Sequence, residues 1–330
     1  MKNSFLSMCL CGALIGSSVL FGGCAPDEVQ VYAPDGAPAL ALAKLLSEDG
    51  ADDGIEYTIT SADKIISFVD GKEPQADVCI LPVNQASNLL GDGDTYQMVG
   101  LATHGNMYFV SADNTPYTIE NIAGLKGKKI GVVQLANVPG LAFRIALDNL
   151  GISYDMQTQS ADAAYLYGVT PDEVSPLGEA DVYLVPEPAA SAKIKAFTAQ
   201  GKPFYMVGDL QAMYGASGFP QAAVVAKKSF IKEEKEKLEE IMAGLSQAEG
   251  YLQTASVAEI CASVSSHLEE GLKGTFSTKN LTTEVISRCN VRFEKSVDCR
   301  LRVDEFLQKM QSVAADSAST VADEFYYIEG

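Results

Sequence analysis

The residues that most often carry nucleophilic catalysis are scarce in this sequence. Only two histidines occur, His104 and His267, so a Ser-His-Asp arrangement would depend on one of them. Neither histidine lies in a recognisable motif. The stretch 215–218 reads Gly-Ala-Ser-Gly and lacks the G-x-S-x-G spacing of a nucleophile elbow. We therefore expect no catalytic residues and no enzyme activity.

Metal and phosphate sites are not indicated either. Residues 124–129 read GLKGKK, without the span or the Ser/Thr of a P-loop. No C-x-x-C is present, and two histidines are too few for a common structural zinc site. The 43 acidic residues are not paired by any motif for acid–base catalysis. The sequence thus predicts neither a metal nor a cofactor.

The N-terminus has the shape of a secretory signal. Lys2 is followed by a largely apolar run from Phe5 to Phe21, and the composition then changes abruptly after Cys24. A retained membrane helix is the alternative, but the Gly and Ser content of the run favours cleavage. Residues 19–24, VLFGGC, resemble the bacterial lipobox, apart from Phe21 where Leu is usual. We expect residues 1–23 to be removed, and Cys24 to carry acyl chains such as palmitate that hold the protein on the outer face of the bacterial cell membrane.

The remaining cysteines fit an exported protein. Cys289 and Cys299 bracket a short stretch and could close a disulfide loop in an oxidising compartment, with two free thiols as the equal alternative. Cys79 lies in an apolar run and is expected to be a small buried residue.

Composition excludes one class of partner. The formal net charge is -19 and the Lys and Arg residues form no basic block, so nucleic acid is not expected to bind. The chain that follows the signal is long enough for two compact lobes, and we expect a monomer.

Strands and helices alternate in the first part of the chain. Strands are predicted at 29–33, 55–60 and 78–81, followed by helices at 37–48, from Ser61 to Val69 and at 85–90. Such alternation predicts a parallel sheet with right-handed crossovers. A long β-rich stretch, 99–110, then interrupts the pattern and is expected to cross between two lobes.

A second α/β unit follows this crossing. We predict a short helix at 119–125, strands at 129–133, 155–160 and 182–185, helices at 141–150 and 189–200, and a return crossing within 206–226. After residue 232 the chain is helical. Leu238, Ile241, Leu245 and Leu252 are spaced as in a coiled coil, but a surface helix that packs this stripe on the lobe is preferred because about two heptads are too few.

Four segments, in this order, carry a family resemblance: Val31–Ala41, Ala76–Asn84, Leu125–Val132 and Glu179–Pro188. Together they resemble the type II extracytoplasmic solute-binding proteins of ABC importers, in the branch for nitrate, sulfonate, taurine and thiamine-pyrimidine uptake. The resemblance covers about residues 28–230. It implies an α/β fold with two lobes, a hinge of two crossings and a ligand cleft between the lobes.

The resemblance and the strand pattern lead to a domain division. Residues 1–23 form the signal and 24–27 the lipidated N-terminus and linker. Lobe 1 is expected to comprise 28–108 and 215–330, and lobe 2 to comprise 109–214.

Ligands of open α/β sheets bind beyond the carboxyl ends of the strands. The expected ligand-binding residues therefore follow strands: Asp35, Gly36, Ala37, Ser61, Val83 and Asn84 on one wall, Gln134, Ala136, Asn137 and Glu187 on the other, and His104 near the hinge. Simpler roles are the alternatives. Gly36 turns the chain, Asn84 and Asn137 cap helices, Glu187 is a solvated charge, and His104 is structural.

Only one of the five arginines, Arg144, is near a predicted cleft turn. A sulfonate or phosphate site would favour more arginine, so a neutral or weakly polar organic solute, such as a flat heterocycle, is preferred. The expected function is capture of this solute for an ABC permease. An enzyme related to pyrimidine synthesis and a lipid-anchored sensory or scaffold module are the alternatives.

Overall fold

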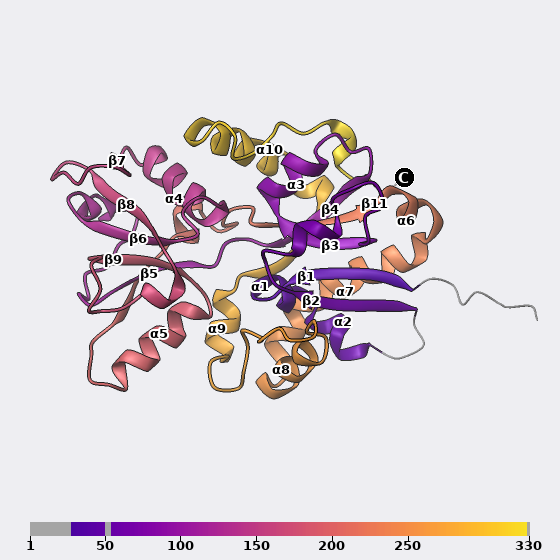
Figure 1. Ribbon diagram of the computed structural model, residues 1–330, viewed down its shortest axis with the longest axis horizontal. Coiled ribbons are helices and arrows are strands. Elements are labelled where there is room, and N and C mark those ends of the chain that lie inside the picture. The colour runs from indigo at the N-terminus through magenta and orange to yellow at the C-terminus, as the bar shows by residue number, and fades with distance from the viewer. Residues whose placement is uncertain (1–27, 50–53, 329–330) are drawn as a thin grey trace, which may run out of the picture.

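The computed structural model describes residues 28–49 and 54–328, and two six-stranded sheets organise them (Figure 1). The first sheet has the strand order β12-β4-β11-β3-β1-β2 and the second has the order β10-β5-β9-β6-β8-β7. The predicted signal, 1–23, and Cys24 lie outside the described residues. We call the first sheet with its helices lobe 1 and the second lobe 2.

Lobe 1 begins with the predicted strand–helix alternation. Strands β1 (Val29–Pro34), β2 (Ile55–Thr60) and β3 (Val78–Pro82) run parallel. The helix predicted at 37–48 is present as two pieces, α1 (Ala37–Ala41) and α2 (Ala43–Glu48), and α3 spans Val83–Leu90. The helix predicted from Ser61 to Val69 is wrong in type, because only a 3-10 turn, η1 (Ile65–Phe68), forms there.

Lobe 1 is completed by strands from distant parts of the chain. Strand β11 (Ala222–Lys227) inserts antiparallel between β3 and β4 (Tyr96–Thr103), and β12 (Val291–Lys295) pairs with the other edge of β4. The chain therefore crosses twice between the lobes, after β4 and before β11.

Lobe 2 is one continuous segment. Its strands are β5 (Met107–Ser111), β6 (Lys129–Val133), β7 (Tyr154–Asp155), β8 (Ala164–Val169), β9 (Val182–Pro186) and β10 (Tyr205–Asp209). Its helical elements are η2 (Ile122–Leu125), α4 (Val138–Asn149), η3 (Pro171–Glu173), α5 (Ala189–Thr198) and η4 (Gln211–Tyr214). The strand predicted at 155–160 is wrong, because β8 lies later in the chain. Strand β5 begins two residues before the predicted boundary at 108/109.

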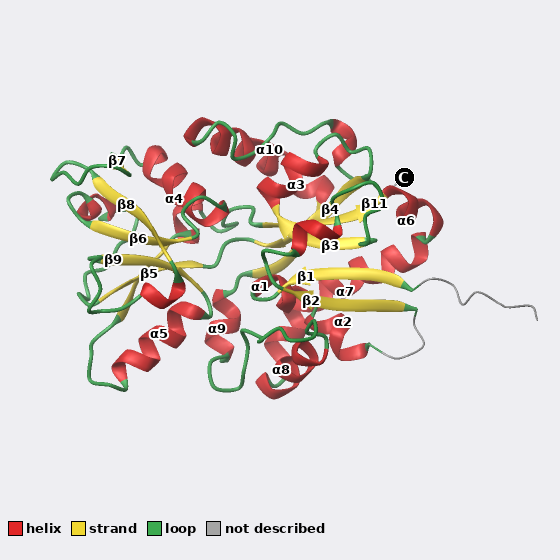
Figure 2. Ribbon diagram, viewed as in Figure 1, coloured by secondary structure: helices red, strands yellow, loops and turns green. Residues whose placement is uncertain are grey.

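Helices from the last third of the chain cover both faces of the lobe 1 sheet (Figure 2). They are α6 (Lys228–Glu233), α7 (Lys235–Thr254), α8 (Val257–Ser266), α9 (Thr283–Arg288), α10 (Ser296–Val313) and the turn η5 (Asp323–Phe325). The stripe on α7 is buried in the lobe 1 core, as predicted for a surface helix that packs on the lobe: Leu238, Ile241, Leu245 and Leu252. None of the described helices is long and apolar enough to cross a membrane.

The two cores of lobe 1 lie on opposite faces of its sheet. Alternate residues along β3 separate them, because Ile80 packs in one core while Cys79 and Leu81 pack in the other. Cys289 belongs to the first of these cores and Cys299 to the second. Both thiols are free, so the disulfide considered for this pair is corrected: the sheet lies between the two side chains.

Helix α10 joins the lobes. It packs on β4 in lobe 1 and on α4 in lobe 2, and Figure 1 shows it lying across the junction above α4. Because Phe306 of α10 and Phe143 of α4 share one buried cluster, the core is continuous from one lobe to the other.

Candidate functional site

The carboxyl ends of the parallel strands in the two lobes point toward the junction between them (Figure 1). In lobe 1, β1 and β3 are neighbours that lead to helices on opposite sides of the sheet. In lobe 2, β6 and β9 have the same relationship. Such switch points form a crevice in open α/β sheets. The loops after these four strands are therefore the candidate site.

The turn after β1 presents backbone to the junction. Gly36 has a φ of 109°, which favours glycine, and no atom lies within 4 Å of the position that a Cβ would take. A side chain at this position would therefore meet no neighbouring residue. Asp35 is already engaged, because its Oδ2 accepts hydrogen bonds from the backbone N–H and the hydroxyl of Thr275, at 2.7 and 2.6 Å. Ala37 is buried in the first turn of α1.

The turn after β2 is held by the carboxylate of Glu269. Thr60, at the end of β2, donates its hydroxyl hydrogen bond to Glu269 at 2.7 Å, and Lys64 forms an ion pair with the same carboxylate at 2.8 Å. Ser61 lies between Thr60 and Lys64 in the sequence, at the same strand end, and it is half-buried. The structure thus places Ser61 at the wall, next to a segment that is fixed by its own contacts.

The turn after β3 leads directly into α3. Val83 is fully buried, and its N–H donates to the carbonyl of Gln221 at 3.0 Å. Asn84 is 6% exposed and donates from Nδ2 to the carbonyl of Ser317 at 3.0 Å, while its Oδ1 has no donor. Asn84 is therefore inside the helix and buried, and does not cap it.

His104 does not reach the junction. Its side chain is fully enclosed, and Nε2 lies 2.9 Å from the carbonyl oxygen of Arg292. Burial, helped by the positive charge of Arg292, lowers the pKa of His104 to about 3, so the ring is neutral at pH 7. The expected ligand role of His104 is thus corrected to a structural one.

The first crossing between the lobes is held by amide hydrogen bonds. Asn106 donates from Nδ2 to the carbonyl of Glu187 and accepts from Nε2 of Gln221, at 2.9 and 3.0 Å. Gly105 has a φ of 90°, and a Cβ there would lie 2.5 Å from Phe219. The crossing is therefore closely packed, and its polar groups tie both chain passages together.

The lobe 2 wall contains a cavity of about 610 Å³ at the ends of β6 and β8. Gln134, Ala136 and Asn137 are exposed there, as expected from the sequence, and Arg144 and Thr170 also line the cavity. Gln134 has a φ of 60°, an uncommon conformation for a residue other than glycine. Such conformations cluster at functional sites.

Helix α4 begins at this cavity without a side-chain cap. Asn137 is its N-cap residue, yet no hydrogen bond links its side chain to the first turn. The amide of Asn137 is consequently available to a ligand, and the positive end of the helix dipole faces the same space.

Glu187 forms a bridge between the lobes. It is 2% exposed, and its carboxylate accepts from the N–H and hydroxyl of Ser191 at 3.0 and 2.6 Å. Arg288 of α9, in lobe 1, lies 3.5 Å from the same carboxylate. Arg288 also accepts a hydrogen bond on its carbonyl from the Tyr108 hydroxyl of lobe 2, at 3.0 Å. The solvated charge considered for Glu187 is thereby corrected to a buried interlobe ion pair.

Two more contacts join the lobes. Lys195 of α5 donates to the carbonyl of Lys279 at 2.8 Å, and Arg144 of α4 donates to the carbonyl of Val313 at the end of α10. The first contact is on the α9 side of the junction and the second is on the α10 side. The lobes are therefore in contact on both sides of the candidate site.

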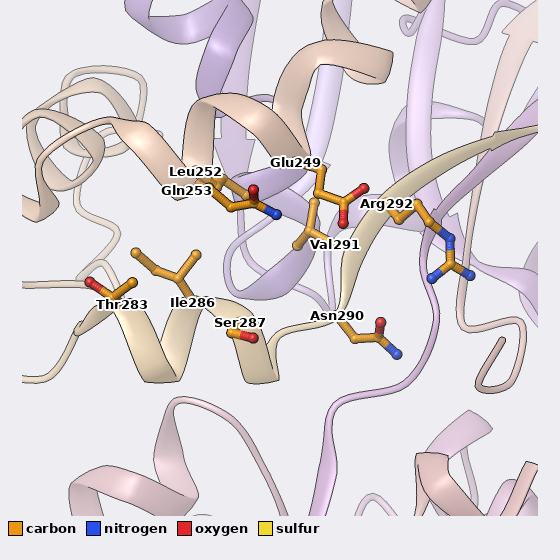
Figure 3. A pocket seen from close by; sticks show the side chains of 9 residues that line it. All are labelled: Glu249, Leu252, Gln253, Thr283, Ile286, Ser287, Asn290, Val291 and Arg292. Carbon is orange, nitrogen blue, oxygen red and sulfur yellow. The ribbon is translucent and has the colours of Figure 1, made fainter. Parts of the chain in front are cut away.

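A separate cavity of about 340 Å³ lies in lobe 1 between α7, α9 and β12 (Figure 3). Thr283, Ile286 and Ser287 line it from α9, opposite Leu252 and Gln253 of α7. None of the expected ligand-binding residues lines this cavity. It belongs to the part of the chain for which the sequence shows no resemblance.

Solved structures of other proteins have a similar fold. Similar folds are found in an ABC transporter protein from Parabacteroides distasonis, with 19% identity and a TM-score of 0.70 over 92% of this chain and 100% of that one. The periplasmic aliphatic sulphonate-binding protein SsuA from Escherichia coli has 14% identity and a TM-score of 0.62, over 93% and 95%. The chain has the two-lobed fold of ABC-importer binding proteins. The fold resemblance inferred from the motifs is thus confirmed.

The same fold also carries an enzyme. The desulfurization enzyme DSZB has 12% identity and a TM-score of 0.53, over 91% of this chain and 97% of that one. No protein-family model and no curated protein matches the sequence. The fold alone therefore does not distinguish binding from catalysis, and the site must do so.

Sequence reasoning missed several residues of the junction. Gln85 lies in the first turn of α3 and Gln221 directly before β11, and Arg288 reaches Glu187 from a helix far along the chain. Gln85 directly follows the predicted Asn84, so the strand-end rule would have found it. Gln221 and Arg288 carry no local signal, because only the tertiary fold brings them to the site.

Proposed function

We propose that this protein is the solute-binding component of an ABC importer, tethered outside the cytoplasm through Cys24, and that it captures a small organic solute between its lobes. The observation that carries the proposal is the cavity at Gln134 and Asn137, beside the ends of parallel strands that point toward the opposite lobe. Its size suits a small molecule, since ligand pockets measure about 300–1,000 Å³.

The interlobe contacts support a hinge mechanism. Only the two crossings connect the lobes covalently. The hydrophobic core is continuous under α10, whereas on the α9 side the lobes meet through the polar contacts of Arg288 and Lys195. Such contacts can separate and re-form as the lobes open and close around a solute. A delivering protein needs this reversibility, because it must release the solute to its permease.

Binding is tested by thermal and calorimetric titration of the chain from residue 24 onward. A solute at about 100 times its Kd should add about 2.7 kcal/mol to the free energy of unfolding. Asn137→Leu should weaken binding about tenfold or more, because it removes the free amide at the cavity. The matched control is Gln247→Leu on the exposed face of α7. No stabilising solute in a broad screen, or equal affinity in both variants, would count against the proposed site.

The lipid anchor is tested separately. In a bacterial host, the wild-type protein should incorporate labelled palmitate and remain with the membrane fraction. Cys24→Ser should lose the label and be released, because the acyl chains supply the membrane affinity. A Cys24→Ser protein that stays firmly on the membrane would show that the anchor is elsewhere.

An enzyme on this scaffold is the second candidate, because DSZB shares the fold. The described residues argue against it. Burial raises the pKa of the Cys79, Cys261, Cys289 and Cys299 thiols, which keeps them protonated and poorly nucleophilic. His267 lies 2.7 Å from Asp49, on lobe 1 at the carboxyl end of α8. Neither kind of group is placed at the cavity.

A further inference from the structure

Four buried side-chain oxygens in the described residues have no hydrogen-bond partner, and all four belong to one region. They are Asn84 Oδ1, Gln85 Oε1, Thr103 Oγ1 and Gln221 Oε1. Burial without a donor costs free energy, so native proteins leave few such atoms unpaired. Four at one place therefore require a partner.

The backbone shows that these residues are neighbours. The carbonyl of Thr103 accepts from the N–H of Gln221 at 3.2 Å, and the carbonyl of Gln221 accepts from the N–H of Val83 at 3.0 Å. Asn84 and Gln85 follow Val83 in the first turn of α3. The cluster thus lies where β3 and β4 end, at the switch point of the lobe 1 sheet and beside the crossings. We call these four residues the acceptor cluster.

Carbonyl groups of the backbone fix the direction of two of the amides. Nδ2 of Asn84 donates to the carbonyl of Ser317, which can only accept, so Oδ1 must be the free end. Nε2 of Gln221 donates to Oδ1 of Asn106, whose own Nδ2 donates to the carbonyl of Glu187. The free end of Gln221 is therefore also an acceptor. An amide flip would place oxygen against oxygen at both positions.

Positive charge is missing from the acceptor cluster. Within residues 28–49 and 54–328, none of its four side chains forms a hydrogen bond or ion pair with Lys or Arg. Arg144, on the other wall, donates to the carbonyl of Val313 and to Tyr154. An oxyanion offers only acceptors, so its oxygens would meet the oxygens of Asn84 and Gln221.

We propose that the acceptor cluster is the lobe 1 half of the solute site and that it selects a neutral or cationic solute carrying N–H or O–H donors, and not a sulfonate, nitrate or phosphate. The inference rests on the proposed function, since it concerns the same junction. Donors of the solute would satisfy Asn84 Oδ1 and Gln221 Oε1. Gln85 Oε1 and the Thr103 hydroxyl, which can accept and donate, lie beside them.

Matched probes test the donor requirement by calorimetry on the chain from residue 24 onward. Uracil and xanthine carry ring N–H donors, and 1,3-dimethyluracil and caffeine are their N-methylated counterparts. Methanesulfonate and nitrate represent anions without hydrogen-bond donors. A metabolite extract is passed over the immobilised protein in parallel, and any retained compound is identified by mass spectrometry and compared with its N- or O-methylated analogue.

We expect a donor-bearing compound to bind and its methylated analogue to bind at least about 100-fold more weakly, because a site built for a donor rejects the analogue that lacks it. Gln221→Met should weaken binding of the donor compound about tenfold, since one accepted hydrogen bond is lost. Gln85→Met is the second variant, and it avoids the crossing. Gln247→Met, on the exposed face of α7, is the matched control and should bind like the wild type.

The outcomes separate the inference from the proposed function. Binding of methanesulfonate or nitrate, but of no donor compound, would overturn the donor requirement and leave the solute-binding role standing. Unchanged affinity in both Gln221→Met and Gln85→Met would show that buried water satisfies the cluster, and would also overturn it. Failure to retain or bind any compound would overturn both.

Discussion

Replacing Arg288 by Met should leave the buried carboxylate of Glu187 without its cation. At an effective dielectric constant of about 20, unit charges at the observed 3.5 Å attract each other by about 5 kcal/mol. Arg288 is partly exposed, and Ser191 continues to donate two hydrogen bonds to the carboxylate. We therefore expect a loss of about 2–3 kcal/mol, below the 3–5 kcal/mol of a fully buried broken pair.

The assay is urea unfolding of four proteins, followed by circular dichroism: wild type, Arg288→Met, Glu187→Gln and the double variant. In the double variant no buried charge is left alone, so it should be about 1–2 kcal/mol more stable than the sum of the single losses predicts. Lys235→Met removes the exposed pair with Glu239 and should cost less than about 0.5 kcal/mol. An Arg288→Met protein as stable as this control, or strictly additive losses, would refute the reasoning.

Three further predictions follow from individual residues. Gly36→Ala forces a side chain onto a φ of 109° with no steric clash, so urea unfolding should show a loss of about 1–3 kcal/mol from backbone strain alone. Burial lowers the pKa of His104 from 6.5 to about 3. The stability that this shift contributes is therefore complete above about pH 6.5 and is lost as the pH falls toward 3, by up to about 1.4 kcal/mol per pH unit. His104→Gln should flatten this part of the stability–pH profile. Thiol alkylation followed by mass spectrometry should find Cys79, Cys261, Cys289 and Cys299 unreactive in the folded protein and all four labelled in urea without reductant, whereas a mass for a Cys289–Cys299 disulfide would contradict the structure.

The elements that local patterns describe best were predicted well. Strands β2 and β6 have the predicted bounds, because β2 alternates apolar and polar residues and β6 is a short buried run. Strand β8 was missed although it alternates, with Ala164 and Leu166 buried between the half-exposed rings of Tyr165 and Tyr167. The ring centroids of Tyr165 and Tyr167 are 5.9 Å apart and the rings are stacked. This contact shows that both side chains lie on one face of the strand, but it is visible only in the folded structure.

The candidate site also contains residues that the sequence indicates and partners that only the fold reveals. Gly36, Asn84 and Asn137 lie within four residues of the end of a strand, so the strand-end rule finds them without any tertiary information. The chemistry of the site depends on partners distant in sequence. Asn84 is oriented by Ser317, and Glu187 is neutralised by Arg288; neither pairing has a local pattern. The strand-end rule therefore proposes a location for the site. The structural alternative for His104 agrees with its burial, whereas the ion pair of Glu187 was not predicted.

The position of β11 has a consequence for how the chain acquires its structure. Strands β3 and β4 are consecutive in sequence but do not pair, because β11 fills the place between them. Until residues 222–227 have emerged on the side of the membrane where the chain folds, β3 and β4 each have an open edge toward that gap. Lobe 2 has all its strands within 107–209 and can assemble as soon as it emerges. The nascent chain should therefore fold from its middle outward, and the exposed edges of the unfinished lobe 1 are the stage at which a chaperone, or a second copy of the chain, would bind.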